Sequence, residues 1–429
     1  MKYERHNPEL FKLNRKRFSR HLKPNSIAIF HSNDQMPRKG DQFFPFVQNP
    51  DLFYLCGLDQ EETVLVIFPD CVKEGFQEVA FIKKTNEHIA IWEGHKYTIE
   101  EAKEVSGLDK VFFLEEMETI LNELILLANR IYFNSNENDR FASDVPLRDD
   151  RFRKQLMEKY PAHKYHRAQP IMKKLRMIKS EHEVTAIQKA CDITEKAFRR
   201  ILKTVKPGVG EHIVEADILH EFLINRATGP AYDPIVASGD SACVLHYTDN
   251  NQTCNDGEVL LMDFGADYGN YAADLSRSIP VSGKFTERQR NVYDAVRKVQ
   301  KQAIEMLVPG NTLAEYHKEV GKMMESELLD LKLLDKTDIK NQSKEKPAYK
   351  KYFMHGTSHH LGIDVHDLGN RYDPFQAGMV FTCEPGIYIL DEGLGVRLEN
   401  DVLVTDNGPK DLMANIPIEA EEIEDLMNS

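Results

Sequence analysis

Two aspartates in the stretch Leu260–Ser278 offer carboxylates at a spacing that suits a shared site. Asp263 ends one apolar run, and Asp274 lies in the next run, eleven residues further along the chain. The polar turn Asp267–Asn270 between them predicts a β-hairpin that brings the two aspartates opposite each other. Two carboxylates at contact distance repel unless a cation lies between them. The pair is therefore either half of a metal site or two solvated aspartates beside a turn.

A second pair of carboxylates follows the same plan towards the C-terminus. Glu384 follows the apolar run Met379–Cys383 directly before a Pro-Gly turn, and Glu399 lies in a strand expected after a glycine turn. Each residue alone would be an ordinary turn residue. Four carboxylates together with a histidine from the segment His355–Asp367 form the ligand set expected for two divalent cations such as Mn²⁺. Two such cations, ~3.5–4 Å apart, can share a bridging water, lower its pKa and stabilise a hydrolytic transition state.

The first 170 residues show short β-rich runs separated by amphipathic segments, which is typical of an α/β domain. The helical spacing of Leu114–Ala128 predicts a helix. A basic connector, Tyr165–Met177, contains Pro170 and sets the expected boundary between domains 1–170 and 171–429. The strands expected in the first domain are Ser26–Phe30, Thr63–Phe68, Glu78–Ile82, His88–Trp92 and Arg130–Phe133.

The second part repeats the order of two helices followed by strands. This order predicts two related halves that each contribute strands to one curved antiparallel sheet, with helices outside. The lysine-rich stretch Lys336–Lys351 is expected to be an exposed loop or a helical insertion. One expected helix begins at Ser180, and three others cover about 213–228, 288–307 and 312–333. The expected strands cover 234–238, 259–264, 271–278, 379–383, 386–390, 395–398 and 402–405.

Composition limits the class of protein. A chain of 429 residues is too long for one ordinary core and suggests two domains. A net charge of −14 argues against a nucleic-acid partner, because phosphate binding requires a basic surface. The six cysteines form no C-x-x-C pair, which favours reduced thiols and a cytoplasmic protein. No secretory signal is visible in the charged start, and no apolar run approaches the ~18 residues of a membrane span.

Four motifs in this order, LMDFGADYGNYAADLSRS, HGTSHHLGIDVHD, CEPGIY and GVRLEND, resemble those of the pita-bread metallopeptidases. That family includes methionine aminopeptidase, prolidase, aminopeptidase P and creatinase. The similarity covers about Ile178–Thr405, and the first domain, with its NPDLFYLCGL stretch, resembles the extra domain of the aminopeptidase P, prolidase and creatinase branch. The resemblance implies a C-terminal pita-bread domain, with a pseudo-two-fold curved sheet, behind an α/β domain.

The resemblance also implies roles for individual residues. Asp274 and Glu399 would bridge both metal ions, and Glu384 would also accept a proton from the bridging water. His246 and His366 match the histidines near the scissile amide, where the second can stabilise the developing oxyanion. The implied metal ligands are Asp263, Asp274, His359, Glu384 and Glu399, and the residues that match the lining of the proline-side pocket are His355, Tyr388 and Arg397.

Within the branch, the sequence Gly356–His359 is more similar to aminopeptidase P than to prolidase, and creatinase lacks the metal ligands. The implied activity is hydrolysis of the N-terminal Xaa-Pro bond of peptides by a metal-bridging hydroxide. The implied cofactors are two divalent ions, with Mn²⁺ favoured over Co²⁺ or Zn²⁺, in a homo-oligomer, dimeric or tetrameric. Two alternatives stay open: a prolidase, in which Arg397 would hold the free carboxylate of a dipeptide, and a non-catalytic pita-bread binding module.

Overall fold

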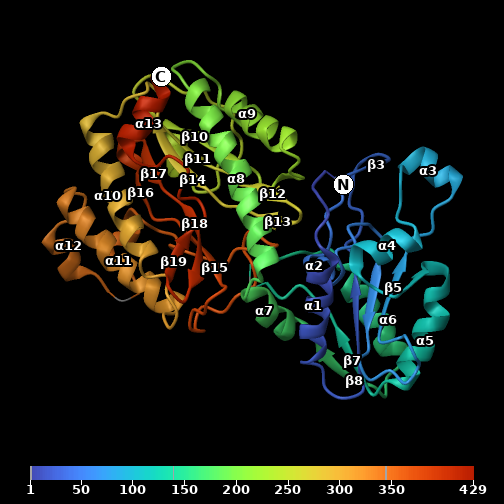
Figure 1. Ribbon diagram of the computed structural model, residues 1–429. Helices are drawn as coiled ribbons and strands as arrows, with labels where there is room; N and C mark the ends of the chain where they lie inside the picture. Colours follow the sequence, from blue (N-terminus) through green and yellow to red (C-terminus); the bar gives the residue numbers. More distant parts are fainter. Residues whose placement is uncertain (1, 139, 344) are drawn as a thin grey trace. The chain divides into compact units, whose positions relative to one another are not determined.

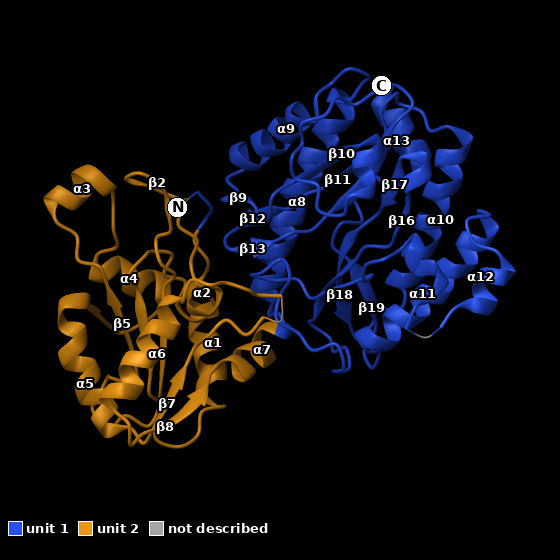
Figure 2. Cartoon of the chain, turned by 180° about the vertical axis from the view of Figure 1, so that it is seen from behind, with its two compact units in different colours: residues 1–4, 177–429 blue, residues 5–176 orange. Residues whose placement is uncertain are grey.

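The chain folds as two units in the computed structural model, which describes residues 2–138, 140–343 and 345–429 (Figure 2). One unit comprises Arg5–Arg176, and the other comprises Met177–Ser429 together with the first residues of the chain. The division falls six residues after the boundary expected at 170, inside the basic connector. Among the described residues, no helix is long and apolar enough to cross a bilayer.

A six-stranded mixed sheet forms the centre of the N-terminal unit, in the order β6-β5-β4-β1-β7-β8. Strand β1 (Ser26–His31) is buried throughout, and it pairs antiparallel with β4 and parallel with β7. Ile27 and Ile29 pack with residues of α5 and α6, whereas Phe30 contacts Phe18 of α1. Burial on both faces explains why this strand is a continuous apolar run. The other elements are β2 (Pro37–Lys39), β3 (Gln42–Phe43), β4 (Val64–Ile67), β5 (Glu78–Ile82), β6 (Lys110–Phe113), β7 (Arg130–Phe133), β8 (Lys164–Arg167), α1 (Pro8–Ser19), α2 (Pro50–Cys56), α4 (Ile99–Ser106), α5 (Met117–Leu127), α6 (Arg148–Lys159) and α7 (Gln169–Met177).

The strand expected at His88–Trp92 is wrong, because this segment forms the short helix α3 (Glu87–Glu93). The Asn86 side chain accepts a hydrogen bond from the backbone N–H of Ile89 and so begins the helix. Ile91 and Trp92 are 79% and 76% exposed, so their apolar character does not reflect packing inside this unit. A short apolar run without strict alternation fits a helix as well as a strand.

Two stretches of the C-terminal unit repeat one pattern of four strands. In the first, β11 (Val259–Asp263) pairs with β14 (Ser276–Pro280), and the hairpin β12–β13 lies between them in the sequence. In the second, β15 (Val380–Cys383) pairs with β18 (Asn400–Thr405), with the hairpin β16–β17 between them. The Glu399 N–H donates to the Ser276 carbonyl at 3.0 Å and joins the two halves. The other strands are β9 (Gly229–Pro230), β10 (Ile235–Ser238), β12 (Ala266–Tyr268), β13 (Tyr271–Ala272), β16 (Gly386–Ile389), β17 (Leu394–Arg397) and β19 (Gly408–Asp411).

Helices lie outside these strands in the C-terminal unit (Figure 1). The expected capping box is present at the start of α8, where Ser180 and Glu183 each hydrogen-bond the backbone of the other. The lysine-rich stretch contains a short helix, α12, whose residues are not buried. All six cysteines carry free thiols, and only Cys243 among them is not buried. The helices of this unit are α8 (Glu181–Thr204), α9 (Glu211–Ile224), α10 (Glu287–Ile304), α11 (Leu313–Asp330), α12 (Lys336–Asn341) and α13 (Ala420–Met427).

The expected hairpin around Asp274 is interrupted. Asp263 pairs with Ser276 rather than with Asp274, because the two-residue loop Gly269-Asn270 sets a register in which Tyr268 pairs with Tyr271 and Asp263 with Ser276. Residues 273–275 lie outside the strands, between β13 and β14. At the break, a Cβ on Gly265 would lie 1.7 Å from the Ala273 carbonyl oxygen, so only glycine allows the two backbones to approach. The loop of the hairpin is Gly269-Asn270, both with positive φ, as two-residue hairpin turns require.

Candidate metal centre

The four carboxylates of the candidate site occupy matching places in the two halves. Asp263 ends β11 and Glu384 directly follows β15, while Asp274 and Glu399 precede β14 and β18. Ligand atoms of Asp274, Glu399 and His359 all lie within 4.8 Å of one another. The internal duplication therefore brings residues that are far apart in the sequence into one cluster.

Backbone hydrogen bonds fix the residues that carry these carboxylates. The N–H of Glu384 donates to the Thr357 carbonyl at 2.8 Å, next to the segment that carries His359. The N–H of Asp274 donates to the Asp401 carboxylate at 3.0 Å, which holds the interrupted hairpin of one half against β18 of the other. Hydrogen bonds of the backbone N–H groups of Glu384 and Asp274 therefore help to fix where their carboxylates lie.

His359 presents its Nε2 atom to this cluster. Its Nδ1 lies 3.0 Å from the His360 carbonyl, which can only accept, so the Nδ1–H donates to it. In the neutral ring, Nε2 then carries a lone pair, and it lies 3.5 Å from Asp274 Oδ2 and 3.6 Å from Glu384 Oε1. A metal cation or a proton between this lone pair and the two carboxylate oxygens would relieve their repulsion, and the orientation of the ring is the usual one for a metal-binding histidine.

The titration behaviour of the cluster reflects the same crowding of negative charge. Burial raises the pKa of Asp274, and burial together with Asp274 raises the pKa of Glu399 well above its usual range. Burial, opposed by His359, raises the pKa of Glu384 to about 7. Burial lowers the pKa of His359, but Asp274 and Glu384 outweigh it and raise the pKa overall. The donor set of oxygens and one imidazole nitrogen thus fits divalent cations, which would neutralise these charges.

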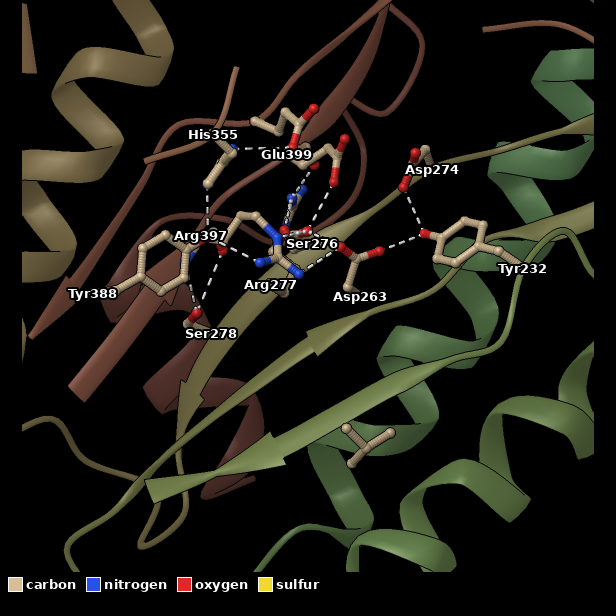
Figure 3. A network of polar contacts seen from close by, with 12 residues as sticks. Tyr232, Asp263, Asp274, Ser276, Arg277, Ser278, His355, Tyr388, Arg397 and Glu399 are labelled. Carbon is tan, nitrogen blue, oxygen red and sulfur yellow. Dashed lines mark hydrogen bonds and ion pairs between the residues drawn. The ribbon is translucent and has the colours of Figure 1, made fainter. Parts of the chain in front are cut away.

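Arg397 connects the cluster to the adjoining pocket residues (Figure 3). Its side chain is 4% exposed, and it donates to Asp263 Oδ2 at 2.6 Å, to Ser276 Oγ at 2.8 Å and to the Tyr388 hydroxyl at 2.9 Å. The Tyr388 hydroxyl lies 2.8 Å from His355 Nε2, and His355 Nδ1 lies 2.8 Å from the Gly356 carbonyl. Burial and Arg397 lower the pKa of His355 to about 3, so this ring is neutral and accepts from Tyr388.

Three side chains that the sequence did not single out also hold the cluster. The Tyr232 hydroxyl lies 2.6 Å from Asp263 Oδ1 and 2.5 Å from Asp274 Oδ1, between the two aspartates (Figure 3). Ser276 Oγ lies 3.0 Å from Asp263 Oδ2 and 2.8 Å from Glu399 Oε2. The buried Arg277 donates to the Glu399 carbonyl at 2.7 Å. Only Arg277 leaves a signal in the sequence, as a positively charged residue inside the strand expected at 271–278.

The two remaining expected residues lie at the margin of the cluster. The His366 ring stands edge-on to His359, with 4.4 Å between the ring centroids. His246 is exposed, and it lies close enough to His355 to contribute to the lowered pKa of that residue. The neighbours Leu245 and Tyr247 pack against a buried group that includes Tyr388. Every expected site residue is therefore in contact with the cluster or near it.

Comparisons with known proteins agree with this geometry. The model of metallopeptidase family M24 matches residues 185–406, and the model of the aminopeptidase P N-terminal domain matches residues 11–132. The Xaa-Pro aminopeptidase of Haemophilus influenzae is 33% identical, over 98% of this chain and 97% of that protein. The Xaa-Pro aminopeptidase of Escherichia coli K12 is 32% identical over 97% of each. The structure of E. coli aminopeptidase P with the inhibitor Pro-Leu matches with a TM-score of 0.89 and 30% identity, over 99% of both chains.

Proposed function

The chain belongs to metallopeptidase family M24 and is a metal-dependent aminopeptidase, and on that premise we propose that it hydrolyses the N-terminal Xaa-Pro bond of peptides. The observation that carries the proposal is the convergence of Asp274, His359 and Glu399 from both halves on one cluster. Members of the family are dinuclear metallopeptidases. The proposed ligands are Asp263, Asp274, His359, Glu384 and Glu399, and the proposed ions are Mn²⁺, with Co²⁺ and Zn²⁺ as alternatives.

The bound ions would activate a water molecule and offset charge that develops on the substrate carbonyl. Glu384 is the proposed proton carrier, since it belongs to the cluster and its carboxylate can take a proton from the attacking water. When the C–N bond breaks, the proline nitrogen keeps the electron pair and must receive a proton to leave as an amine, and Glu384 would deliver that proton. His246 and His366 are proposed to hydrogen-bond the substrate around the scissile amide, and His355 and Tyr388 to line the proline-side pocket.

The contacts of Arg397 favour an aminopeptidase over a prolidase. A prolidase requires a cation that holds the free carboxylate of its dipeptide substrate. Arg397 is buried and already donates to Asp263, Ser276 and Tyr388, so its guanidinium serves the site itself. A substrate without a carboxylate at that position needs no such cation, as is the case for longer peptides.

One assay with added Mn²⁺ tests the proposal, by comparing an Xaa-Pro-Yaa tripeptide, an Xaa-Pro dipeptide and a Met-Ala peptide. We expect the tripeptide to give the highest kcat/KM, because Arg397, the cation considered for a dipeptide carboxylate, already donates to Asp263, Ser276 and Tyr388. Cleavage of the dipeptide alone would identify a prolidase, and cleavage of none would identify a binding module. The Asp274→Ala variant should remain folded by circular dichroism and lose activity, whereas Glu422→Ala on the exposed face of α13 should keep it. Substantial turnover by Asp274→Ala would contradict the assignment of the metal ligands.

We also propose that the enzyme is a cytoplasmic homo-oligomer whose N-terminal domain, residues 1–170, contributes to self-association. Buried free thiols support a reducing compartment. The exposed Ile91 and Trp92 on α3 support an interface, because large apolar side chains on a surface favour a partner. In light scattering, the variant with Ile91→Ser and Trp92→Ser should have a lower mass than wild type. The control is Val72→Ser, at an isolated residue that is 84% exposed. An unchanged mass would show that α3 is not the interface.

A further inference from the structure

Glu211 is a fully buried carboxylate outside the metal cluster. It is the first residue of α9, and its four hydrogen-bond donors are all neutral. Oε1 accepts from the backbone N–H of Ser238 at 2.8 Å and from its hydroxyl at 2.7 Å. Oε2 accepts from the Tyr247 hydroxyl at 2.9 Å and from the Gln252 N–H at 2.9 Å.

This arrangement gives each oxygen of the carboxylate two hydrogen-bond donors. A buried polar group whose partners are all present is held rigidly by them. Glu211 is therefore a rigid anchor for the groups that donate to it.

The bonds of Glu211 clamp one particular segment. Ser238 and Gln252 stand at its two ends, and Tyr247 lies inside it, directly after His246. The backbone N–H of Glu211 also donates to the Gln252 carbonyl at 2.9 Å. Within the segment, Tyr247 packs against the buried group that includes Tyr388 of the proline-side pocket.

We infer that Glu211 is a positioning residue, which fixes the exposed His246 over the site through the Tyr247 hydroxyl. The inference rests on the proposed function, in which His246 contacts the substrate. An exposed imidazole on a segment of irregular structure has many orientations, and loss of orientation lowers the rate of a reaction without removing any reacting group. One hydroxyl then determines how well His246 serves the reaction.

The test removes that hydroxyl in Tyr247→Phe and measures kcat and KM with an Xaa-Pro-Yaa tripeptide. We expect kcat/KM to fall about tenfold, the range of a hydrogen bond to a charged group. The fall in kcat/KM should come from kcat and KM in the same proportion as the fall caused by His246→Ala. The metal content of the variant should equal that of wild type. Glu211→Gln should change kcat and KM in the same proportion but lower kcat/KM further. The glutamine NH2 group would face the Tyr247 hydroxyl and the Gln252 N–H, which are themselves donors. Tyr160→Phe is the control, since it removes a buried tyrosine hydroxyl that donates to Asn122 Oδ1 within the N-terminal unit.

A double-mutant cycle separates positioning from general stability. If Tyr247 acts through His246, the substitution Tyr247→Phe costs nothing further in the His246→Ala background. Equal losses in both backgrounds, or a loss matched by Tyr160→Phe, would overturn the inference. A fully active His246→Ala would instead refute the substrate role of His246 within the proposed function. If His246→Ala lowers kcat/KM and Tyr247→Phe does not, the positioning role of Glu211 and Tyr247 is refuted, and the substrate role of His246 is retained.

Discussion

His317 on α11 supports the loop that carries two residues of the site. Its Nε2 lies 3.1 Å from the Ser358 carbonyl, between His355 and His359 in the sequence. Burial lowers the pKa of His317 to about 4, so the fold favours the neutral ring. Above pH 6.5 both folded and unfolded chains hold this ring neutral. As the pH falls from 6.5 to about 4, the unfolded chain binds a proton that the folded chain does not, and stability is lost.

The substitution His317→Gln isolates this effect, because glutamine can donate to the same carbonyl and does not titrate. We expect wild type to lose up to about 3 kcal/mol of unfolding free energy relative to the variant between pH 6.5 and pH 4. Urea unfolding at pH 7.5, 6.0 and 5.0 measures this difference. If the unfolding free energies of wild type and His317→Gln fall by the same amount over this pH range, His317 is not a source of the acid sensitivity.

The types and order of residues led to the proposed donor set, because carboxylates and histidines can be recognised in a sequence as potential metal ligands. Tyr232 and Ser276 could not be found in the same way. Their contribution is a hydroxyl placed between aspartate and glutamate oxygens, and only the fold brings Tyr232, on the segment before β10, to Asp263 and Asp274. The sequence predicted only part of the role of Arg397. Its burial and its hydrogen bonds to Asp263, Ser276 and Tyr388 depend on the packing of the folded unit.

The break in the hairpin between β11 and β14 depends on one glycine. The substitution Gly265→Ala would place a Cβ against the Ala273 carbonyl, and backbone cannot move aside as a flexible side chain can. We expect a loss of about 1–3 kcal/mol of unfolding free energy and a larger fall in activity, because the shift displaces Asp274. The control Gly229→Ala lies in β9, where a Cβ meets nothing within 4 Å. Equal effects of the two substitutions on activity would contradict this account.

A buried ion pair joins the start of α8 to the loop that carries His366. Lys179 Nζ lies 3.0 Å from Asp367 Oδ2, and each side chain is 1% exposed. The single substitution Lys179→Met should cost about 3–5 kcal/mol, because it leaves a buried carboxylate without its cation. The double variant with Lys179→Met and Asp367→Leu should cost less than Lys179→Met alone. Chemical denaturation measures both, and equal or greater loss in the double variant would show that the pair itself stabilises the loop.

Helices and strands that are specified by nearby residues could be predicted from the sequence, whereas interruptions within a strand could not. The capping box at Ser180 and the apolar run of β1 specify their own structure. The interruption at residues 273–275 depends on contacts with Gly265 and Asp401, which are formed only in the folded unit. Helix α3 was missed because a short apolar run does not distinguish a helix from a strand.

The whole molecule consists of two units with separate cores, but the proposed metal ligands all belong to one of them. Ions that bind only the folded state stabilise it in proportion to the logarithm of their concentration over Kd. At a hundredfold excess over Kd this stabilisation is about 2.7 kcal/mol, which corresponds to a shift of about 5–11 °C in the melting temperature of a unit of this size. Removal of the ions also leaves Asp274, Glu384 and Glu399 crowded without neutralising charge.

We therefore expect chelation by EDTA to lower the melting temperature of the C-terminal unit and leave that of the N-terminal unit unchanged. Differential scanning calorimetry with EDTA and after addition of Mn²⁺ tests this expectation, and the Asp274→Ala variant should respond much less to either treatment. Fluorescence of a variant with Trp92→Phe and Phe133→Trp, which moves the single tryptophan into the buried core of the N-terminal unit, identifies the transition of that unit. A shift of that transition on chelation, or an equal response in Asp274→Ala, would mean that the stabilising ions bind elsewhere.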